Sequence, residues 1–568
     1  MSEPITDRGA ISPIQTGTVH YRRRAERPFL ASERQHTTIL FGGLTWKHER
    51  LIRAVLQGCG YLCETIPTPD IQSYQLGREY CNTGQCNPVY FTVGSLLRYL
   101  EQLRAQGRTR QQIVDSYVFF TAGSCGPCRF GTYESEFRLA LENAGYRGFR
   151  VLTFQQDRGI QADTGEPGMK FTVDFGMGML NALVLADIVS DTSYRLRPYE
   201  VEPGSTNRTI DRIEQRSEAY LRDGRRFELA DRFPIGRVYL ASRRDSKRYR
   251  TINTIGKIYD HMRGRNYRRL LRDCREELSN IKVDRLRVRP VVKVVGEFWA
   301  QLTESAGNYN LFAFLESEGG ELIIDPISTW PTYLLHQAKQ RVRTRVRLES
   351  IHNDRTWMRF RFDTEPRRRL ALCSLGETLY KAHYRAARKA LGGIATDLAS
   401  QQQMGRLADP HYNQLARGGE GHLEIGKSLY YANKALAHLI ISVKPFGCLP
   451  STQSDAVQWS LVSRTSGFAF LSVETSGEGE IDALSRVQLA MADARAKAME
   501  EFEQCVRKTG IPLADIRGYA DEHAYLSSPL YQVPRRPGVV GLAANFALHV
   551  GELMKRSWKS GASREGSL

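Results

Sequence analysis

The segment "TTILFGGLTWKHERLIRAVLQGCGYLCETIPTP" (37–69) constrains the fold more than any other part of the chain. An apolar run ends at a Gly-Gly turn, a helical repeat then places Leu51, Val55 and Leu56 on one face, and a second apolar run follows. A strand, a crossover helix and a second strand in this order form a parallel pair. The sequence therefore predicts an α/β fold in which helices cover parallel sheets.

The same alternation recurs along the 568 residues, which are too many for one ordinary core. Further strands are predicted at 115–123 and 149–157, and a long helix at 175–200. We expect the following division: a disordered N-terminal tail (1–35), a first α/β domain (36–164), a helical and basic linker region (165–285), a second α/β unit (286–400), a C-terminal α/β unit (401–515) and an extended C-terminal tail (516–568).

Three cysteines occupy equivalent places in this pattern: Cys86, Cys128 and Cys448. They lie in "CNTGQCNP" (81–88), "FFTAGSCGPCRFG" (119–131) and "IISVKPFGCLPS" (441–451), each between a strand-like run and a helix-like run. Ligands of open α/β sheets gather beyond the carboxyl ends of the strands, so these thiols are expected to meet. Three convergent thiolates at helix N-termini suit an iron–sulfur cluster, and a 4Fe–4S cluster is the expected form.

Three thiolates leave one iron of such a cluster with a replaceable position. Cys125 and Cys81 are the nearest fourth ligands, and the sequence does not choose between them. Arg129 is expected to balance the cluster charge from a second shell. Cys274, Cys373 and Cys505 are interpreted as packing residues, while Cys59 and Cys63 either chelate a metal or pack.

Two other functions fit parts of the sequence. "CGPC" at 125–128 is the thioredoxin active-site motif, which predicts thiol–disulfide exchange by Cys125 and Cys128. The net charge is +18, and the stretch 237–293 holds 18 Lys and Arg against 6 Asp and Glu. This stretch indicates either a polyanion-binding surface or a solvated basic surface, but without a recognisable nucleic-acid module we do not expect nucleic acid as a partner. "RVRTRVRL" (341–348) alternates like an exposed strand edge.

The glycine-rich segment "ARGGEGHLEIGKSLYY" (416–431) supplies further polar candidates. Glu420, Glu424 and Lys427 are interpreted either as substrate-contacting or proton-transferring residues, or as solvated loop charges. No N-terminal signal and no apolar run of membrane-spanning length is recognised, so we expect no membrane association. Ten cysteines without a signal peptide favour thiols or metal ligands in a cytoplasmic setting.

The motifs together resemble those of the 2-hydroxyacyl-CoA dehydratase iron–sulfur proteins, and most of all their CoA-activase-associated branch. The resemblance covers about 36 to 510 and rests on "TGQCNPVYFTVGSLL", "GPCRFGTYE", "YRLRPYEVEPGST", "GEFWAQL", "GEGHLEIGKS" and "VKPFGCLPS". It implies Cys86, Cys128 and Cys448 as ligands of a cluster between tandem flavodoxin-like or Rossmann-like domains. It allows a double-cubane 8Fe–9S cluster in place of 4Fe–4S.

The resemblance also implies an activity and partners. Members of the family accept one low-potential electron from an ATP-dependent actin/Hsp70-like activase, and use it for reductions or radical dehydrations of small molecules such as CoA thioesters. A homodimer or heterodimer is the expected assembly. The sequence contains no ATPase segment, so the activase or another electron donor is expected as a separate chain. After "GEFW" the chain reads "AQLTESAGNYN", where the family carries an arginine and an Asp-Pro-Phe-like run, so the substrate surface there is expected to differ.

Overall fold

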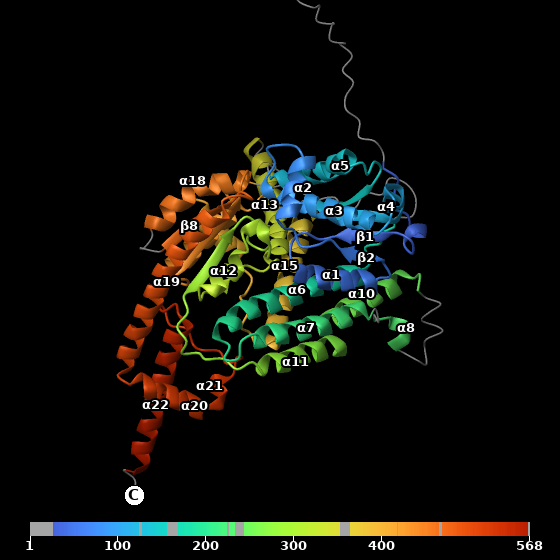
Figure 1. The fold of residues 1–568 in the computed structure, drawn as a ribbon. Helices are drawn as coiled ribbons and strands as arrows, with labels where there is room; N and C mark the ends of the chain where they lie inside the picture. Colours follow the sequence, from blue (N-terminus) through green and yellow to red (C-terminus); the bar gives the residue numbers. More distant parts are fainter. Residues whose placement is uncertain are drawn as a thin grey trace, which may run out of the picture.

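The computed structural model describes residues 26–123, 128–155, 168–223, 227–232, 244–352, 364–416, 419–464 and 469–565. In this part of the chain, eight strands form two four-stranded sheets, and every strand pair within them is parallel. Figure 1 shows the two sheets in the upper half of the molecule, with a layer of long helices below them. The predicted α/β class with parallel sheets is confirmed.

The first sheet has the strand order β2-β1-β3-β4. Its strands are β1 (Thr38–Phe41), β2 (Cys63–Thr65), β3 (Tyr117–Gly123) and β4 (Arg150–Gln155). Its helices are α1 (Trp46–Gly58), α2 (Ile71–Tyr80), α3 (Asn87–Ala105), α4 (Arg110–Ser116) and α5 (Tyr133–Asn143). Apolar side chains of α3 and α5 cover one face, and those of α1 and α6 (Val173–Leu196) cover the other. Coverage of both faces explains why the central strands β1 and β3 are largely apolar.

The second sheet repeats this arrangement with the order β6-β5-β7-β8. Its strands are β5 (Val291–Gly296), β6 (Glu321–Ile323), β7 (Leu439–Pro445) and β8 (Ala469–Thr475). The helices around it are α12 (Leu311–Ser317), α16 (Gln401–Ala408), α17 (Gly421–Asn433), α18 (Leu449–Arg464) and α19 (Glu480–Thr509). Residues 286–400 and 401–515, expected as two units, thus build one sheet, because β5 pairs directly with β7.

A helical layer packs under the first sheet. It comprises α6, α7 (Ser205–Arg222), α8 (Leu229–Arg232), α10 (Lys247–Arg263), α11 (Arg265–Ser279) and α15 (Thr364–Ala390), with α13 (Thr329–His352) beside α15. Among the described residues, Val173–Tyr199 is the one helix long and apolar enough to cross a membrane, so the expectation that no such run exists is wrong. Ala182, Leu185 and Val189 of this helix lie in the buried core of the helical layer.

Two further segments differ from the expected structure. "RVRTRVRL" belongs to α13 and is not a strand, because Val342 and Val346 are four residues apart and share a helix face. The expected C-terminal tail contains α20 (Leu513–Glu522), α21 (Ala524–Ser527) and α22 (Leu542–Glu565). Ile516, Phe546 and Val550 of these helices share a buried core with Phe502 and Cys505 of α19, and the helices extend downward in Figure 1.

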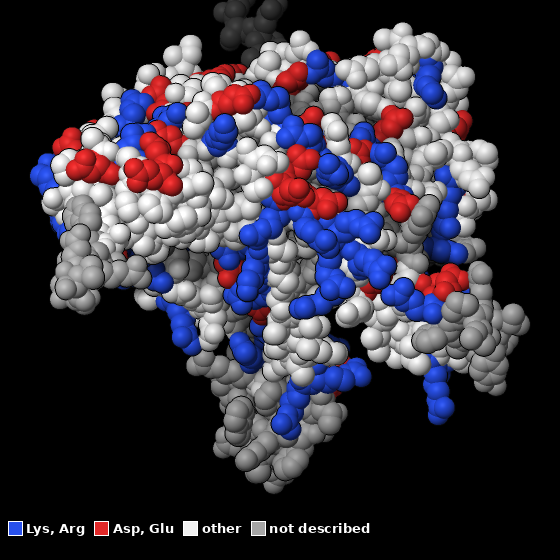
Figure 2. All heavy atoms as spheres, turned by 90° about the horizontal axis from the view of Figure 1, so that it is seen from below, with Lys and Arg blue, Asp and Glu red and all other residues white. Residues whose placement is uncertain are grey.

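Two lysines of the basic stretch 237–293 form ion pairs within the protein. Lys293 is fully buried against Asp325, and Lys257 pairs with Asp174 at 2.5 Å. Figure 2 shows Lys and Arg side chains gathered in the middle of one face, with a group of Asp and Glu side chains beside them. The net charge of this stretch therefore overstates the basic surface that it presents to a partner.

Loops at the carboxyl ends of the two sheets contact each other. The indole N–H of Trp299, shortly after β5, donates to the carbonyl of Gly43, after β1, at 2.6 Å. Glu304 accepts hydrogen bonds from the Trp46 indole at 3.0 Å and from the Lys47 ammonium at 2.9 Å. In each sheet these loops lie where the strand order reverses, which is the usual place for a ligand in an open α/β sheet.

Candidate functional site

Each of the three cysteines lies immediately before a helical segment. Cys448 separates β7 from α18, and Cys128 is the N-cap of a short 3₁₀ helix, η2 (Arg129–Thr132), that leads into α5. Cys86 is the N-cap of α3, with Pro88 in the first turn as expected. The element before Cys86 is the helix α2, so the strand expected there is wrong.

The loops that carry Cys86 and Cys448 pack directly against each other. The backbone N–H of Asn87 donates to the carbonyl of Phe446 at 3.2 Å, and its side chain donates to the carbonyl of Thr475 at 2.6 Å. Gly447 has a φ of 77°, and a Cβ atom there would lie 3.4 Å from the Cα atom of Cys86. Glycine at this position therefore lets the end of β7 approach the start of α3.

Tyr133 joins the Cys86 loop to the Cys128 loop. This first residue of α5 has its hydroxyl 3.2 Å from the sulfur of Cys86, and its side chain is buried. Arg129 donates a hydrogen bond to the carbonyl of Gly84, so it also links the Cys128 loop to the Cys86 loop. Burial raises the pKa of Cys128, and the nearby Glu420 carboxylate and Cys86 thiol add to this effect. The loops that carry the three cysteines, from both sheet domains, thus lie in one region.

Three carboxyl groups lie in the same region: Glu297, Glu420 and Glu424. Glu297 follows β5 directly and accepts a hydrogen bond from the backbone of Ala300 at 2.9 Å. Burial, opposed by two backbone hydrogen bonds, raises the pKa of Glu297 to about 7. Burial also raises the pKa of Glu420 well above its usual value, with further increases from Glu297 and Glu424. Both groups therefore hold protons at a pH where an exposed glutamate is ionised.

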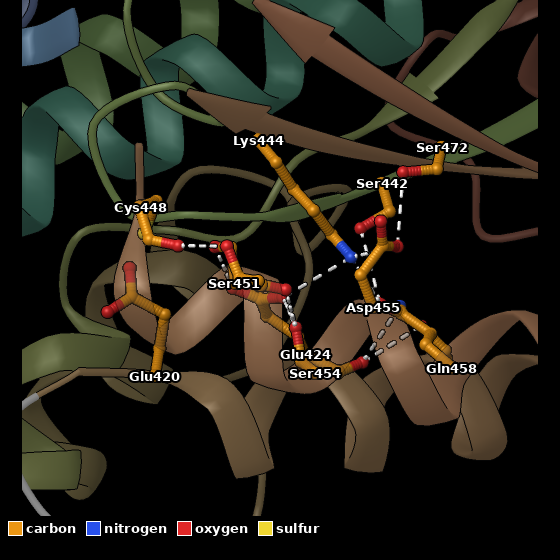
Figure 3. A network of polar contacts seen from close by, with 12 residues as sticks. Glu420, Glu424, Ser442, Lys444, Cys448, Ser451, Ser454, Asp455, Gln458 and Ser472 are labelled. Carbon is orange, nitrogen blue, oxygen red and sulfur yellow. Dashed lines mark hydrogen bonds and ion pairs between the residues drawn. The ribbon is translucent and has the colours of Figure 1, made fainter. Parts of the chain in front are cut away.

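Glu424 belongs to a hydrogen-bonded network, which Figure 3 shows beside Cys448. Ser451 donates to one of its carboxylate oxygens at 2.8 Å, and Ser454 donates to the other. The ammonium group of Lys444 lies 4.0 Å from Glu424 and also pairs with Asp455, whose side chain is 44% exposed. The network therefore connects a partly exposed carboxylate with a buried carboxyl group next to a cysteine.

The surroundings disfavour free thiolates at all three cysteines. Burial raises the pKa of Cys86 to about 11, and it raises the pKa of Cys448 further, with added contributions from Glu297, Glu424 and Glu420. The helix N-termini were expected to favour the thiolates, but desolvation outweighs that effect here. Thiolates in this region require a positive counter-charge.

The other predicted ligands are placed as follows. Cys125 lies outside the described residues. Cys81 lies at the C-terminus of α2, where burial and the Glu136 carboxylate raise its pKa to about 12. Among the described residues, no three or more His, Cys, Asp or Glu side chains are arranged to hold a single metal ion. The choice of a fourth ligand therefore stays open.

The three polar candidates of the glycine-rich segment are buried, so the solvated-loop interpretation is wrong. Glu420, Glu424 and Lys427 are 5%, 1% and 5% exposed, because they lie at the start of α17, which packs against the second sheet. Glu420 and Glu424 face the cysteines. Lys427 instead pairs with Asp325 at 2.7 Å, and Asp325 also binds Lys293 of β5 at 2.8 Å.

Replacing Asp325 by asparagine is expected to lower the free energy of unfolding by about 3–5 kcal/mol, because it leaves two buried ammonium groups without a counter-charge. Burial opposes ionisation of Asp325, but Lys293 and Lys427 lower its pKa to about 2. Its ionised form therefore stabilises the fold above the ordinary pKa of 3.8, and this contribution is lost as the pH falls through about 2. Chemical denaturation at pH 7 measures the effect. Asp245→Asn, at a side chain that is 98% exposed, should change stability by less than about 0.5 kcal/mol, and an equal loss in both variants would contradict the argument.

Two residues of this region, Glu297 and Tyr133, were not singled out from the sequence. Glu297 directly follows a buried strand, and Cys448 was predicted from the same pattern, a position shortly after a strand. Tyr133 begins a helix five residues after Cys128, and nothing in the sequence alone indicates that its hydroxyl turns toward Cys86.

In the thioredoxin-like interpretation Cys125, which lies outside the described residues, would attack and Cys128 would resolve, so the raised pKa of Cys128 does not decide it. Because Cys128 is also a predicted cluster ligand, the wild-type protein is expected not to reduce the disulfides of insulin in a turbidity assay with dithiothreitol as electron donor. Reduction above the reagent background that disappears in Cys128→Ser would contradict this expectation.

Comparisons with known proteins do not extend the description of the site. No protein-family model matches the chain, and no curated protein matches it. The resemblance carried by the sequence motifs therefore remains a prediction.

Proposed function

We propose that this chain is an iron–sulfur protein whose cluster is bound by Cys86, Cys128 and Cys448. It would act as a low-potential one-electron reductase or radical dehydratase component on a small molecule of the CoA-thioester type. The observation that carries the proposal is that the loops of two buried cysteines, Cys86 and Cys448, and of the partly buried Cys128 lie next to one another, although they come from both sheet domains. The order 2-1-3-4 in each sheet also supports tandem flavodoxin-like domains.

The chemistry of the donor set fits such a cluster. Thiolates are the usual ligands of iron–sulfur clusters, and a positively charged metal centre removes the cost that burial imposes on them. Each cysteine would bind a different iron, so the three sulfur atoms need not surround a single-ion position. When bound, the cluster supplies storage for one electron and an iron with a replaceable ligand, in a 4Fe–4S or an 8Fe–9S form.

The surrounding residues have distinct tasks under this proposal. Tyr133 orients the sulfur of Cys86 through its hydroxyl, and Arg129 holds the Cys86 and Cys128 loops together. Glu297 and Glu420 keep protons next to the thiols near neutral pH. Lys444, which is paired with Asp455, would balance the charge of Glu424 next to Cys448.

The proposal includes partners outside the chain. A separate ATP-dependent activase of the actin/Hsp70-like type, or another low-potential donor, would supply the electron, and a homodimer or heterodimer is the expected assembly. A cytoplasmic setting is part of the proposal because low-potential clusters are sensitive to oxygen.

Purification of the wild type without air, followed by iron and acid-labile sulfide analysis and a visible spectrum, tests the proposal. We expect a brown protein with iron and sulfide in comparable amounts and a broad absorption that bleaches with dithionite. A colourless protein without iron, obtained anaerobically and after reconstitution with iron and sulfide, would refute it.

A further inference from the structure

A pocket lies beside α17, lined in part by Lys427, Tyr430 and Tyr431. Its volume is about 590 Å³, within the usual range for small-molecule sites. Its walls come from the end of α6, the β6 edge of the second sheet, residues 393–404, α17 and residues 529–535. None of the cysteines lines it, so it is separate from the region described above.

The pocket contains more positive than negative side chains. Its acidic members are Glu321, Asp325 and Asp397, and each already has a partner. Glu321 accepts a hydrogen bond from the Tyr199 hydroxyl at 2.7 Å and lies 3.5 Å from Arg195. Asp325 binds two lysines, as described above, and Asp397 pairs at 2.8 Å with Arg385, which lies outside the pocket.

Three arginines of the pocket have no carboxylate partner in the described part of the chain. Arg285 is 7% exposed and donates only to backbone carbonyls of residues 526–531, at 2.5 to 3.1 Å. Arg388 donates to the carbonyl of Ala395, and Arg535 lies near the Tyr199 hydroxyl. A buried guanidinium without a close carboxylate is costly, so Arg285 requires an explanation, and the more exposed Arg388 and Arg535 add positive charge at the same cavity.

The backbone also contributes positive charge to the pocket. The N-cap residue Ser400 and the first-turn residue Gln403 of α16 line the pocket, so the N-terminus of that helix faces it. A helix N-terminus carries partial positive charge and unsatisfied N–H groups, both of which favour an anion.

We infer that this pocket binds a small polyanion, a molecule with two or more phosphate or carboxylate groups held by Arg285, Arg388 and Arg535. Guanidinium groups bind both kinds of anion through paired hydrogen bonds, which explains arginine at all three positions. The inference is independent of the cluster, because it uses other residues and a different cavity.

Isothermal titration calorimetry of the full chain with inorganic pyrophosphate, and separately with citrate, at constant ionic strength tests the inference. The wild type is expected to bind at least one of them, and Arg388→Gln with Arg535→Gln should weaken that binding at least about tenfold. These two side chains are more exposed than Arg285, so the double variant should fold. Binding of pyrophosphate alone would identify phosphate as the recognised group, and binding of citrate alone would identify carboxylate.

Lys247→Gln with Arg248→Gln is the matched control, since it removes the same charge from exposed positions of α10 that do not line the pocket. It should bind as the wild type does. The inference is overturned if neither anion binds the wild type at millimolar concentration, or if the pocket variant and the control bind equally well.

Discussion

Serine in place of Cys86, Cys128 or Cys448 is expected to reduce the iron content of the anaerobically purified protein at least about tenfold and to remove its visible absorption. A serine hydroxyl is a poor substitute for a thiolate at iron, and even changes next to a metal ligand cost 10- to 100-fold in metal affinity. Because the three residues come from both sheets, each single variant should have a similar effect. Iron and sulfide analysis with visible spectra measures it.

Cys274→Ser and Cys505→Ser are the matched controls. Both side chains are buried, at 0% and 2% exposure, but they lie in the helical layer and in the C-terminal helical core. They should keep the cluster even where a buried hydroxyl lowers stability. If only one of the three site variants lost iron, or if the controls lost as much, the shared site would be wrong. Parallel Cys81→Ser and Cys125→Ser variants identify a fourth ligand.

Gly94→Ala is expected to lower the free energy of unfolding by about 3 kcal/mol or more. A Cβ atom at Gly94 of α3 would lie 1.7 Å from the backbone carbonyl oxygen of Ser73 in α2. Gly77 of α2 packs against α3 in the same way, because a Cβ atom at Gly77 would lie 1.9 Å from the backbone carbonyl oxygen of Tyr90 in α3. Backbone atoms of two packed helices cannot move aside as a flexible side chain can, so the helices must separate.

The same substitution tests how Cys86 is positioned. Cys86 is the N-cap of α3, so separation of α2 from α3 should also reduce the iron content of the protein that remains folded. Gly518→Ala in α20 is the control, because no atom lies within 4 Å of its Cβ position. It should leave stability unchanged or raise it by up to about 1 kcal/mol. Chemical denaturation followed by circular dichroism compares the two, and equal stabilities would contradict the packing argument.

The sequence predicted the strands well because each is a short apolar run that must be buried on both faces. It did not predict that β5 and β7 share a sheet, since 142 residues separate Gly296 from Leu439 and most of them are helical. The C-terminal helices were missed because the polar, Gly- and Ser-containing end "KSGASREGSL" suggested a tail without a core. The spacing of Ala543, Phe546, Ala547 and Val550 was nonetheless helical.

For the candidate site, the strand-end argument accounts for the positions of Cys128 after β3 and Cys448 after β7, whereas Cys86 reaches the region between the helices α2 and α3. The burial of Glu420 and Glu424 was not predictable, since glycine-rich surroundings are typical of exposed loops. Glu297 has no motif around it that distinguishes a buried acid from a solvated one. Its role depends on which helices cover the end of β5, and that is decided by contacts between residues far apart in the sequence.

An anomalous difference map, recorded at the iron absorption edge on crystals grown without air, tests the central claim most directly. We predict one strong group of iron peaks enclosed by the sulfur atoms of Cys86, Cys128 and Cys448. A map from iron-loaded protein with no peak there, or with its peaks at other residues, would contradict the proposed site.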